Sequence, residues 1–282
     1  MLQKPALSNR IALGLVDFFN PPTIVIGMHR SGTTLISRLL DFFGFYVGDD
    51  LEENHESLFF QGLNDKLLEK GGGNWFDIEG VLSAMKNPDW EKGEVAWLKD
   101  QILSNLFHVF FRQKRFQSRF IQKSEFRWGW KDPRSSLTLP LWLKIFPRAR
   151  VIHIFRHGLD VAISLHRREL RGLTHMRDSP LYTGLDFCLK LWERYTVQCF
   201  RYRALGPGRY FEIKFEDLLS APEAHLKRLV RFLGIRPAKD KLGAAVQMVD
   251  QNATGRFNEN EFGDFSRRAR ESCPLLRELQ YG

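Results

Sequence analysis

Residues 23–34 read Thr-Ile-Val-Ile-Gly-Met-His-Arg-Ser-Gly-Thr-Thr, a short apolar run that leads into a loop of the G-x4-G type. Apolar residues then recur at helical spacing, at positions 35, 36, 39, 40 and 43. A buried strand that passes through such a loop into a helix directs the N–H groups of the loop and the positive end of the helix dipole toward one point. The segment therefore predicts an anion-binding loop in an α/β fold; the alternative is a plain strand-to-helix turn capped by Ser31.

The cation of this loop is Arg30, which lies inside it. In the loop of nucleoside triphosphatases the second Gly is followed by Lys and then Ser or Thr, whereas here Gly32 is followed by Thr33. The planar guanidinium of Arg30 suits phosphate or sulfate, and Ser31, Thr33 and Thr34 add hydroxyl donors. The loop is therefore expected to bind an anion other than ATP.

A second strand-to-helix unit begins with the apolar run 151–155 and continues into a helix from residue 158. Arg156 ends the strand, at the edge of an open α/β sheet where ligands bind. Ser164 follows eight residues later, about two helical turns on. Two structural alternatives are open: Arg156 can pair with Asp160 four residues on, and Ser164 can bond back to a helix carbonyl.

The two motifs together resemble those of the sulfotransferases that use 3′-phosphoadenosine 5′-phosphosulfate (PAPS), in the bacterial and tyrosylprotein-type branch. In that family a loop reading P-K/R-S-G-T-T binds the 5′-phosphosulfate, and an Arg followed eight residues later by a Ser binds the 3′-phosphate. The resemblance implies that PAPS is bound by two sets of residues, namely His29, Arg30, Ser31, Gly32, Thr33 and Thr34 in the loop, and Arg156 with Ser164 in the second unit.

Further segments extend this resemblance over most of the chain. Trp130-Lys131-Asp132-Pro133-Arg134 is similar to the K-D-P stretch of the family, which implies a catalytic role for Lys131 at the transferring group. A surface Lys before a Pro turn is the alternative. The segments 146–151, 215–235 and 266–282 also resemble family segments. Residues 71–122 match nothing recognisable and are expected to form a helical, acceptor-side region.

The resemblance implies a general base between the loop and residues 64 and 65. Counting back from the Asn64-Asp65 pair places Glu56 where the family has a Glu, so Glu56 is the expected base. His55 is the competing candidate because its ordinary pKa lies near neutrality. Glu56 can instead be a first-turn residue of the following helix, where the dipole favours a carboxylate.

Strands and helices alternate along the chain, which predicts a parallel sheet covered by helices. The expected strands are 23–27, 127–131, 150–155 and 209–215. The expected helices are 31–43, 58–70, 93–113, 137–146, 158–170, 183–205, 222–234 and 268–280. These elements predict an α/β three-layer sandwich with a central parallel sheet and a P-loop-like phosphosulfate loop, as one domain over residues 1–282.

Composition sets limits on the class of protein. The chain of 282 residues has no apolar stretch long enough to span a bilayer and no signal-peptide pattern, so a soluble cytoplasmic protein is expected. Its three cysteines lack metal or disulfide spacing and are expected to be reduced and mostly buried. The net charge of +9 comes without any nucleic-acid-binding module, so nucleic-acid binding is not expected.

No metal is expected, because the loop lacks the Gly-Lys-Ser/Thr ending and the strand at 151–155 ends in Arg156 rather than a carboxylate. We therefore predict an enzyme that moves a sulfuryl group from PAPS to a hydroxyl or amine acceptor, giving 3′-phosphoadenosine 5′-phosphate (PAP) and a sulfated product. The alternatives are a P-loop nucleotide kinase or nucleoside triphosphatase, and a non-catalytic nucleotide-binding protein.

Overall fold

The computed structural model describes residues 20–111, 126–171, 184–250 and 259–281, together with Asp17 and Ala253. Four strands form one parallel sheet in the order β2-β1-β3-β4, flanked by helices. They are β1 (Thr23–Ile26), β2 (Gly129–Lys131), β3 (Arg150–Phe155) and β4 (Tyr210–Lys214). Every residue of β1 and β2 is buried, as expected for a parallel sheet between helices. The predicted α/β fold with a central parallel sheet is confirmed.

The pairing of β1 with β2 depends on a close backbone approach. Val25 lies opposite Lys131 in this register, and Thr23 lies opposite Gly129. A Cβ atom at Gly129 would lie 1.9 Å from the Thr23 carbonyl oxygen, so any side chain there would push the strands apart. The register places Lys131 at the carboxyl end of β2, the edge at which ligands bind in open α/β sheets.

The described residues form two compact units. The first, which we call unit 1, comprises residues up to Ile26 and from Ile36 to Ile152; the second, unit 2, comprises Gly27–Leu35 and residues from His153 onward. Helix α2 (Thr33–Phe42) begins in unit 2 and continues in unit 1. That residues 1–282 form a single domain stays a prediction.

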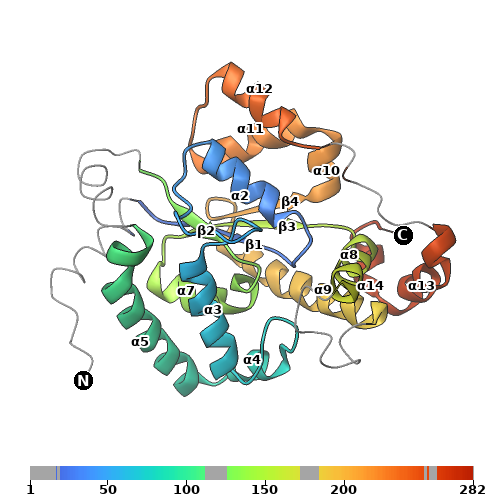
Figure 1. Cartoon of the computed structure of the whole chain (residues 1–282), viewed down its shortest axis with the longest axis horizontal. Helices are drawn as coiled ribbons and strands as arrows, with labels where there is room; N and C mark the ends of the chain where they lie inside the picture. Colours follow the sequence, from blue (N-terminus) through green and yellow to red (C-terminus); the bar gives the residue numbers. More distant parts are fainter. Residues whose placement is uncertain are drawn as a thin grey trace. The chain divides into compact units, whose positions relative to one another are not determined.

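Unit 1 is built around aromatic rings. Its further helices are α3 (Leu58–Lys70), α4 (Glu79–Ala84), α5 (Pro88–Asn105), a π-helix (Leu106–Phe110) and α7 (Ser135–Ile145). Helix α7 packs against β1, α3 and α5 (Figure 1). The ring of Phe60 stacks on that of Trp130 with centroids 3.9 Å apart, and both side chains are fully buried. Such large buried rings contribute much of the apolar area that holds α3 and α7 on the sheet.

Unit 2 contains the other helices of the described residues. They are α8 (Gly158–Leu170), α9 (Leu185–Phe200), a 3-10 helix (Arg201–Leu205), α10 (Phe215–Ser220), α11 (Pro222–Leu233), α12 (Lys239–Gln247), α13 (Glu259–Ser272) and α14 (Pro274–Glu278). Helices α8 and α9 lie side by side, and α10, α11 and α12 form another group (Figure 1). A Cβ atom at Gly158 would lie 2.7 Å from the Trp192 ring, so the glycine lets α8 approach α9.

Two predicted helices have wrong boundaries because a proline lies at a different place in the helix than the prediction assumed. The helix predicted at 93–113 begins at Pro88, because Asn87 accepts hydrogen bonds from the N–H groups of Asp89 and Trp90 and Pro88 fits the first helical position. The helix predicted at 268–280 is two helices, since Pro274 interrupts it after Cys273. Residues 112–122 of the predicted acceptor-side region lie outside the described residues.

Shorter helices were missed. Helices α4 and α12 were not among the predicted elements. Glu216 and Asp217, which follow the last strand, lie in the first turn of α10. Other predicted ends differ by a few residues, whereas 58–70 and 158–170 match α3 and α8.

The three cysteines are buried and unpaired, as predicted. Burial raises the pKa of the Cys188 thiol to about 12 and that of Cys273 to about 11, so both remain protonated and unreactive at neutral pH. Among the described helices none is long and apolar enough to cross a membrane. The predicted cytoplasmic location is not tested by this observation.

Candidate active site

The anion loop lies in unit 2 and has a constrained backbone. Gly27 and Gly32 have φ values of 142° and 96°, and Arg30 itself has φ 71°. A left-handed conformation at a residue with a Cβ costs about 1 kcal/mol or more, and such strain is concentrated at functional sites. The loop closes through a bond from the Ser31 N–H to the Met28 carbonyl, 3.2 Å long. These conformations and this hydrogen bond constrain the backbone of the loop.

The side chains of the loop residues contact different parts of unit 2. Arg30 donates from Nε to the hydroxyl of Ser164, 3.0 Å away, so the structure joins the two predicted PAPS motifs directly. His29 is buried and lies edge-on to the Tyr195 ring, with centroids 6.5 Å apart. Thr33 and Thr34 begin α2. The Ser164 hydroxyl therefore accepts a hydrogen bond from Arg30 and helps to hold its guanidinium in place.

One hydroxyl donor and one guanidinium donor of the predicted PAPS motifs are buried and lack a hydrogen-bond partner among the described residues. They are the Ser31 hydroxyl and Nε of Arg156, on side chains that are 0% and 5% exposed. Leaving a buried donor unsatisfied costs on the order of 1–3 kcal/mol, and more for a charged group. An anionic ligand with several acceptor oxygens would satisfy both donors, so these residues fit the phosphate groups of a nucleotide such as PAPS.

Arg156 also has structural partners. Its Nη2 donates to Asp160 at 2.9 Å and to the Ala253 carbonyl at 3.0 Å, and its guanidinium lies 4.7 Å from the centre of the Phe215 ring. The ion pair with Asp160, one of the two alternatives raised by the sequence, is therefore present. It holds the side chain in place and leaves Nε for another acceptor.

The predicted base lies in unit 1, within a buried charge cluster. Glu56 accepts from Lys131 Nζ at 2.8 Å through one carboxylate oxygen and from Arg134 Nη1 at 3.0 Å through the other. Glu56 and Lys131 are 4% and 1% exposed, so Lys131 is not the surface residue that the alternative supposed. Burial raises the pKa of Glu56, and the Asp132 carboxylate raises it further, while Lys131 and Arg134 oppose the rise.

Arg134 was quoted in the sequence motif but given no role. It also bonds Asp132 at 3.0 Å and approaches Asp65 at 2.6 Å, so three carboxylates surround one guanidinium. These carboxylates raise the pKa of Arg134 against the lowering effect of its burial. Arg134 thus restricts the orientation of the Glu56 carboxylate through their hydrogen bond. The sequence signal was the charge alternation in Lys131-Asp132-Pro133-Arg134.

Asn64 anchors this cluster from α3. Its amide nitrogen donates to Asp132 at 2.7 Å and to Ser135 at 3.0 Å, while its carbonyl oxygen accepts from Thr138 at 2.7 Å and Trp142 at 2.8 Å. Every hydrogen-bonding position of a fully buried amide is therefore used or shared, which makes the arrangement rigid. The Asn64-Asp65 pair was used only to count back to Glu56, and its own role was missed.

His55 lies beside Glu56 in the chain but has other partners. Its backbone has φ 65°, its Nδ1 lies 3.1 Å from the Ser37 hydroxyl, and its Nε2 lies 3.7 Å from Asp41. Burial lowers the pKa of His55, and Asp41 only partly opposes this effect. The imidazole is therefore neutral at neutral pH, and its contacts with Ser37 and Asp41 hold it toward α2.

Comparison with known proteins agrees with these features. The family model described as "Sulfotransferase family" matches residues 21–240. The chain is 28% identical to the omega-hydroxy-beta-dihydromenaquinone-9 sulfotransferase Stf3 of Mycobacterium bovis, over 83% of this chain and 67% of the relative. The Stf3 protein of Mycobacterium tuberculosis gives the same figures.

Two solved structures are similar at lower identity. The sulfotransferase domain of the Synechococcus PCC 7002 olefin synthase is 20% identical, covers 85% of this chain and 80% of that domain, and has a TM-score of 0.48. The mouse sulfotransferase SULT7A1 complexed with PAP is 14% identical, with 84% and 68% coverage and a TM-score of 0.44.

The match over residues 21–240 shows that the chain belongs to the sulfotransferase family. It is a PAPS-dependent sulfotransferase, as the sequence predicted, and the kinase and non-catalytic alternatives are not favoured. Among the described residues no cluster of His, Cys, Asp or Glu is suited to hold a metal ion. Metal-independent transfer stays a prediction, as do the roles of the individual site residues.

Proposed function

We propose that this enzyme transfers the sulfuryl group of PAPS to the hydroxyl of an acceptor, with the residues of the two predicted PAPS motifs as donor ligands and Glu56 as the group that removes the acceptor proton. The observation that carries the donor assignment is the pair of unsatisfied buried donors on Ser31 and Arg156. Together with Arg30 and Ser164 they supply hydroxyl and guanidinium donors in the pattern that a 5′-phosphosulfate and a 3′-phosphate require.

The transfer breaks the bond between sulfur and the donor's phosphate oxygen and forms a bond between sulfur and the acceptor oxygen. The leaving oxygen stays on PAP and gains negative charge, which Arg30 and the loop N–H groups stabilise. The acceptor hydroxyl loses its proton to the Glu56 carboxylate. Lys131 then supplies positive charge for the transferred group, while Arg134 holds Glu56 in position.

Three features support Glu56 over His55 as the base. Glu56 is paired with Lys131, whereas His55 contacts Ser37 and Asp41. A carboxylate whose pKa is raised is a stronger base than an ordinary one, which suits removal of a proton from a hydroxyl. Its attachment to Arg134 also limits its rotation, so the proton acceptor is pre-oriented.

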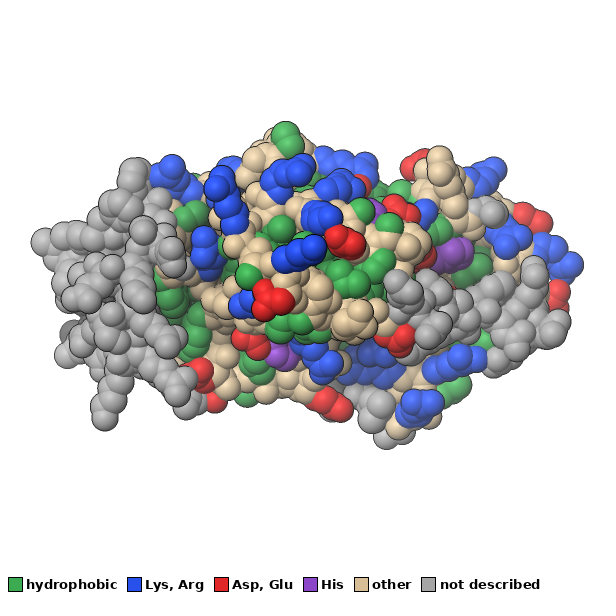
Figure 2. Space-filling model, turned by 90° about the horizontal axis from the view of Figure 1, so that it is seen from above, with side chains coloured by type: hydrophobic (Ala, Val, Ile, Leu, Met, Phe, Trp, Pro, Cys, Tyr) green, Lys and Arg blue, Asp and Glu red, His purple; other side chains and the backbone are tan. Residues whose placement is uncertain are grey.

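The names of the Stf3 relatives, which include a menaquinone-type lipid, support a lipid alcohol as the acceptor. The basic excess does not by itself indicate a polyanionic acceptor. Lys and Arg side chains on the face shown in Figure 2 are interspersed with acidic and apolar ones. That nucleic acid is not a partner remains a prediction.

Ligand choice tests the donor assignment. We expect PAP to bind roughly 30-fold more tightly than AMP, because loss of the 3′-phosphate leaves the Arg156 guanidinium without that partner, a loss on the order of 2 kcal/mol. Isothermal titration calorimetry measures both affinities. Arg156→Ala and Ser164→Ala should each reduce the preference, while Arg267→Ala, at a side chain that is 71% exposed in the same unit, should leave it unchanged. Equal affinities in the native enzyme would contradict the assignment.

Metal dependence gives a second test. We expect the transfer rate to be the same in EDTA and in magnesium, because Arg30, Lys131 and the loop stabilise the charge of the leaving group. The rate of PAP release under both conditions is the measurement. A strict magnesium requirement would contradict these roles and favour a kinase-like mechanism.

A further inference from the structure

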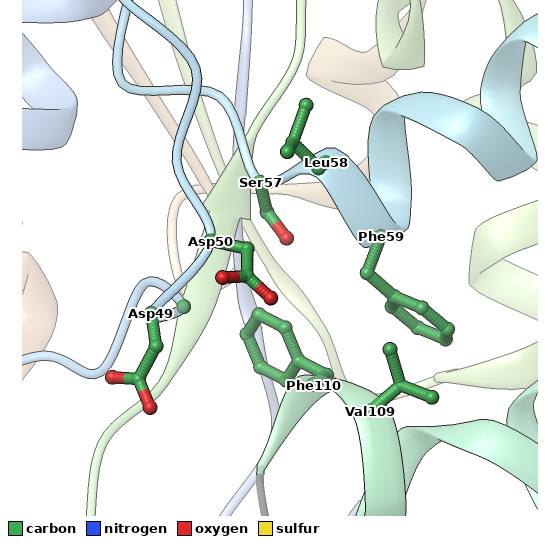
Figure 3. A pocket seen from close by; sticks show the side chains of 8 residues that line it. Asp49, Asp50, Ser57, Leu58, Phe59, Val109 and Phe110 are labelled. Carbon is green, nitrogen blue, oxygen red and sulfur yellow. The ribbon is translucent and has the colours of Figure 1, made fainter.

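A pocket of about 230 Å³ lies within unit 1, between the segment that precedes α3, the start of α3 and the π-helix. Its wall includes Asp49, Asp50, Ser57, Phe59, Val109 and Phe110. In Figure 3 the Ser57 hydroxyl and the Asp50 carboxylate point toward the same space, Phe59 and Val109 lie across it from them, and the Phe110 ring lies below Asp50. The pocket is therefore apolar on one side and polar on the other.

The apolar side is exposed to solvent to an unusual degree. Leu58 and Val109 are 52% and 46% exposed, and both line this pocket; only two other large apolar side chains are comparably exposed in the described parts of the chain. Val109 and Phe110 belong to the π-helix, a rare conformation that is frequent at functional sites. Exposed apolar side chains around a cavity indicate a site for an apolar ligand.

The polar side adjoins the proposed base. Ser57 follows Glu56 in the chain, and its hydroxyl does not cap α3 although it stands at the N-cap position. It therefore remains available to a ligand in the pocket. Asp49 and Asp50 are exposed and add negative charge at the same wall. Like charges repel, and they do so more strongly near a protein surface than in bulk water.

We propose that this pocket binds the apolar body of the acceptor, and that the acceptor is an uncharged amphipathic alcohol, such as a lipid alcohol, rather than an anionic sugar or peptide. This inference rests on the proposed function, because it takes Glu56 as the group that receives the acceptor's proton. The volume is below the usual 300–1,000 Å³ of a complete ligand site, so the pocket holds only part of the acceptor.

The pocket can be tested with an uncharged apolar dye, N-phenyl-1-naphthylamine, whose fluorescence rises on binding. Val109→Lys places a charge in the apolar wall and should weaken dye binding at least about tenfold. Val197→Lys is the matched control, since Val197 is 42% exposed but lies on α9 in unit 2. Equal dye binding by both variants and the native enzyme would overturn the proposal.

Charge selectivity is tested by displacing the dye with 1-octanol and with 8-hydroxyoctanoate. 1-Octanol, which is neutral, should displace the dye at a roughly tenfold lower concentration than 8-hydroxyoctanoate. The Asp50→Asn variant should reduce this ratio of displacing concentrations, because it removes one negative charge from the pocket wall. The acceptor role is tested with PAPS: Val109→Lys should lower the rate of sulfation of 1-octanol while PAP affinity stays unchanged. An unaltered ratio in Asp50→Asn, or no sulfation of 1-octanol and its longer homologues, would overturn the proposal. Failure of the native enzyme to bind PAP would instead contradict the proposed function.

Discussion

Glu56→Gln is expected to lower the turnover of sulfuryl transfer by roughly 100-fold or more while PAP affinity stays nearly unchanged. Gln keeps the shape of the side chain but cannot accept the proton, and loss of a general base has effects of this size. Steady-state kinetics with a verified acceptor, together with PAP titration, measure both quantities. His55→Ala should have the smaller effect. If His55→Ala abolishes turnover and Glu56→Gln does not, His55 is the base.

The pH profile separates the base from a merely structural carboxylate. A general base must be deprotonated, and the pKa of Glu56 is raised, so activity should fall on acidification at a higher pH than an ordinary carboxylate would show. Arg134→Gln removes a cation that stabilises the carboxylate and should move this acidic limb to still higher pH. An acidic limb that stays in place in Arg134→Gln would contradict the positioning role of Arg134.

Arg30→Ala is expected to lower kcat by roughly 100- to 1,000-fold, the range for loss of one preorganised donor at a developing negative charge. The change removes both the guanidinium and its bond to the Ser164 hydroxyl. Arg30→Lys should recover only part of the rate, because an ammonium lacks the planar fork of donors. Single-turnover measurements at saturating PAPS report this step.

The control for Arg30 is Arg38→Ala, which removes an exposed Arg from the same helix-forming segment. Its rate should match that of the native enzyme, and thermal unfolding of each variant shows whether the loop still folds. A rate for Arg30→Ala within a few-fold of the native rate would show that leaving-group charge is stabilised elsewhere.

Local patterns were sufficient for most of the fold. Residues 58–70 and 158–170 form helices as predicted, because apolar periodicity and turn residues act within a few positions of each other. The errors lie at prolines, because a proline can either begin a helix or interrupt one. Pro88 begins α5, and Pro274 divides the last helix, yet both have the same fixed φ and missing N–H group. The difference depends on neighbours such as Asn87, whose side chain caps the helix.

The local order of residues 23–34, with two glycines and a cation inside the loop, was enough to indicate an anion-binding loop and, by resemblance, the sulfotransferase class. Tertiary structure alone placed Glu56 on Lys131 and Arg134, and Asn64 on Asp132, across 75, 78 and 68 residues of chain. It also formed the pocket of Ser57 and Phe110. The periodicity of a sequence shows which side chains share one face of a helix or strand. The partner of a buried charge depends instead on how separate elements pack, because only a neighbouring group of opposite charge or a hydrogen-bond partner offsets the free-energy cost of removing that charge from water.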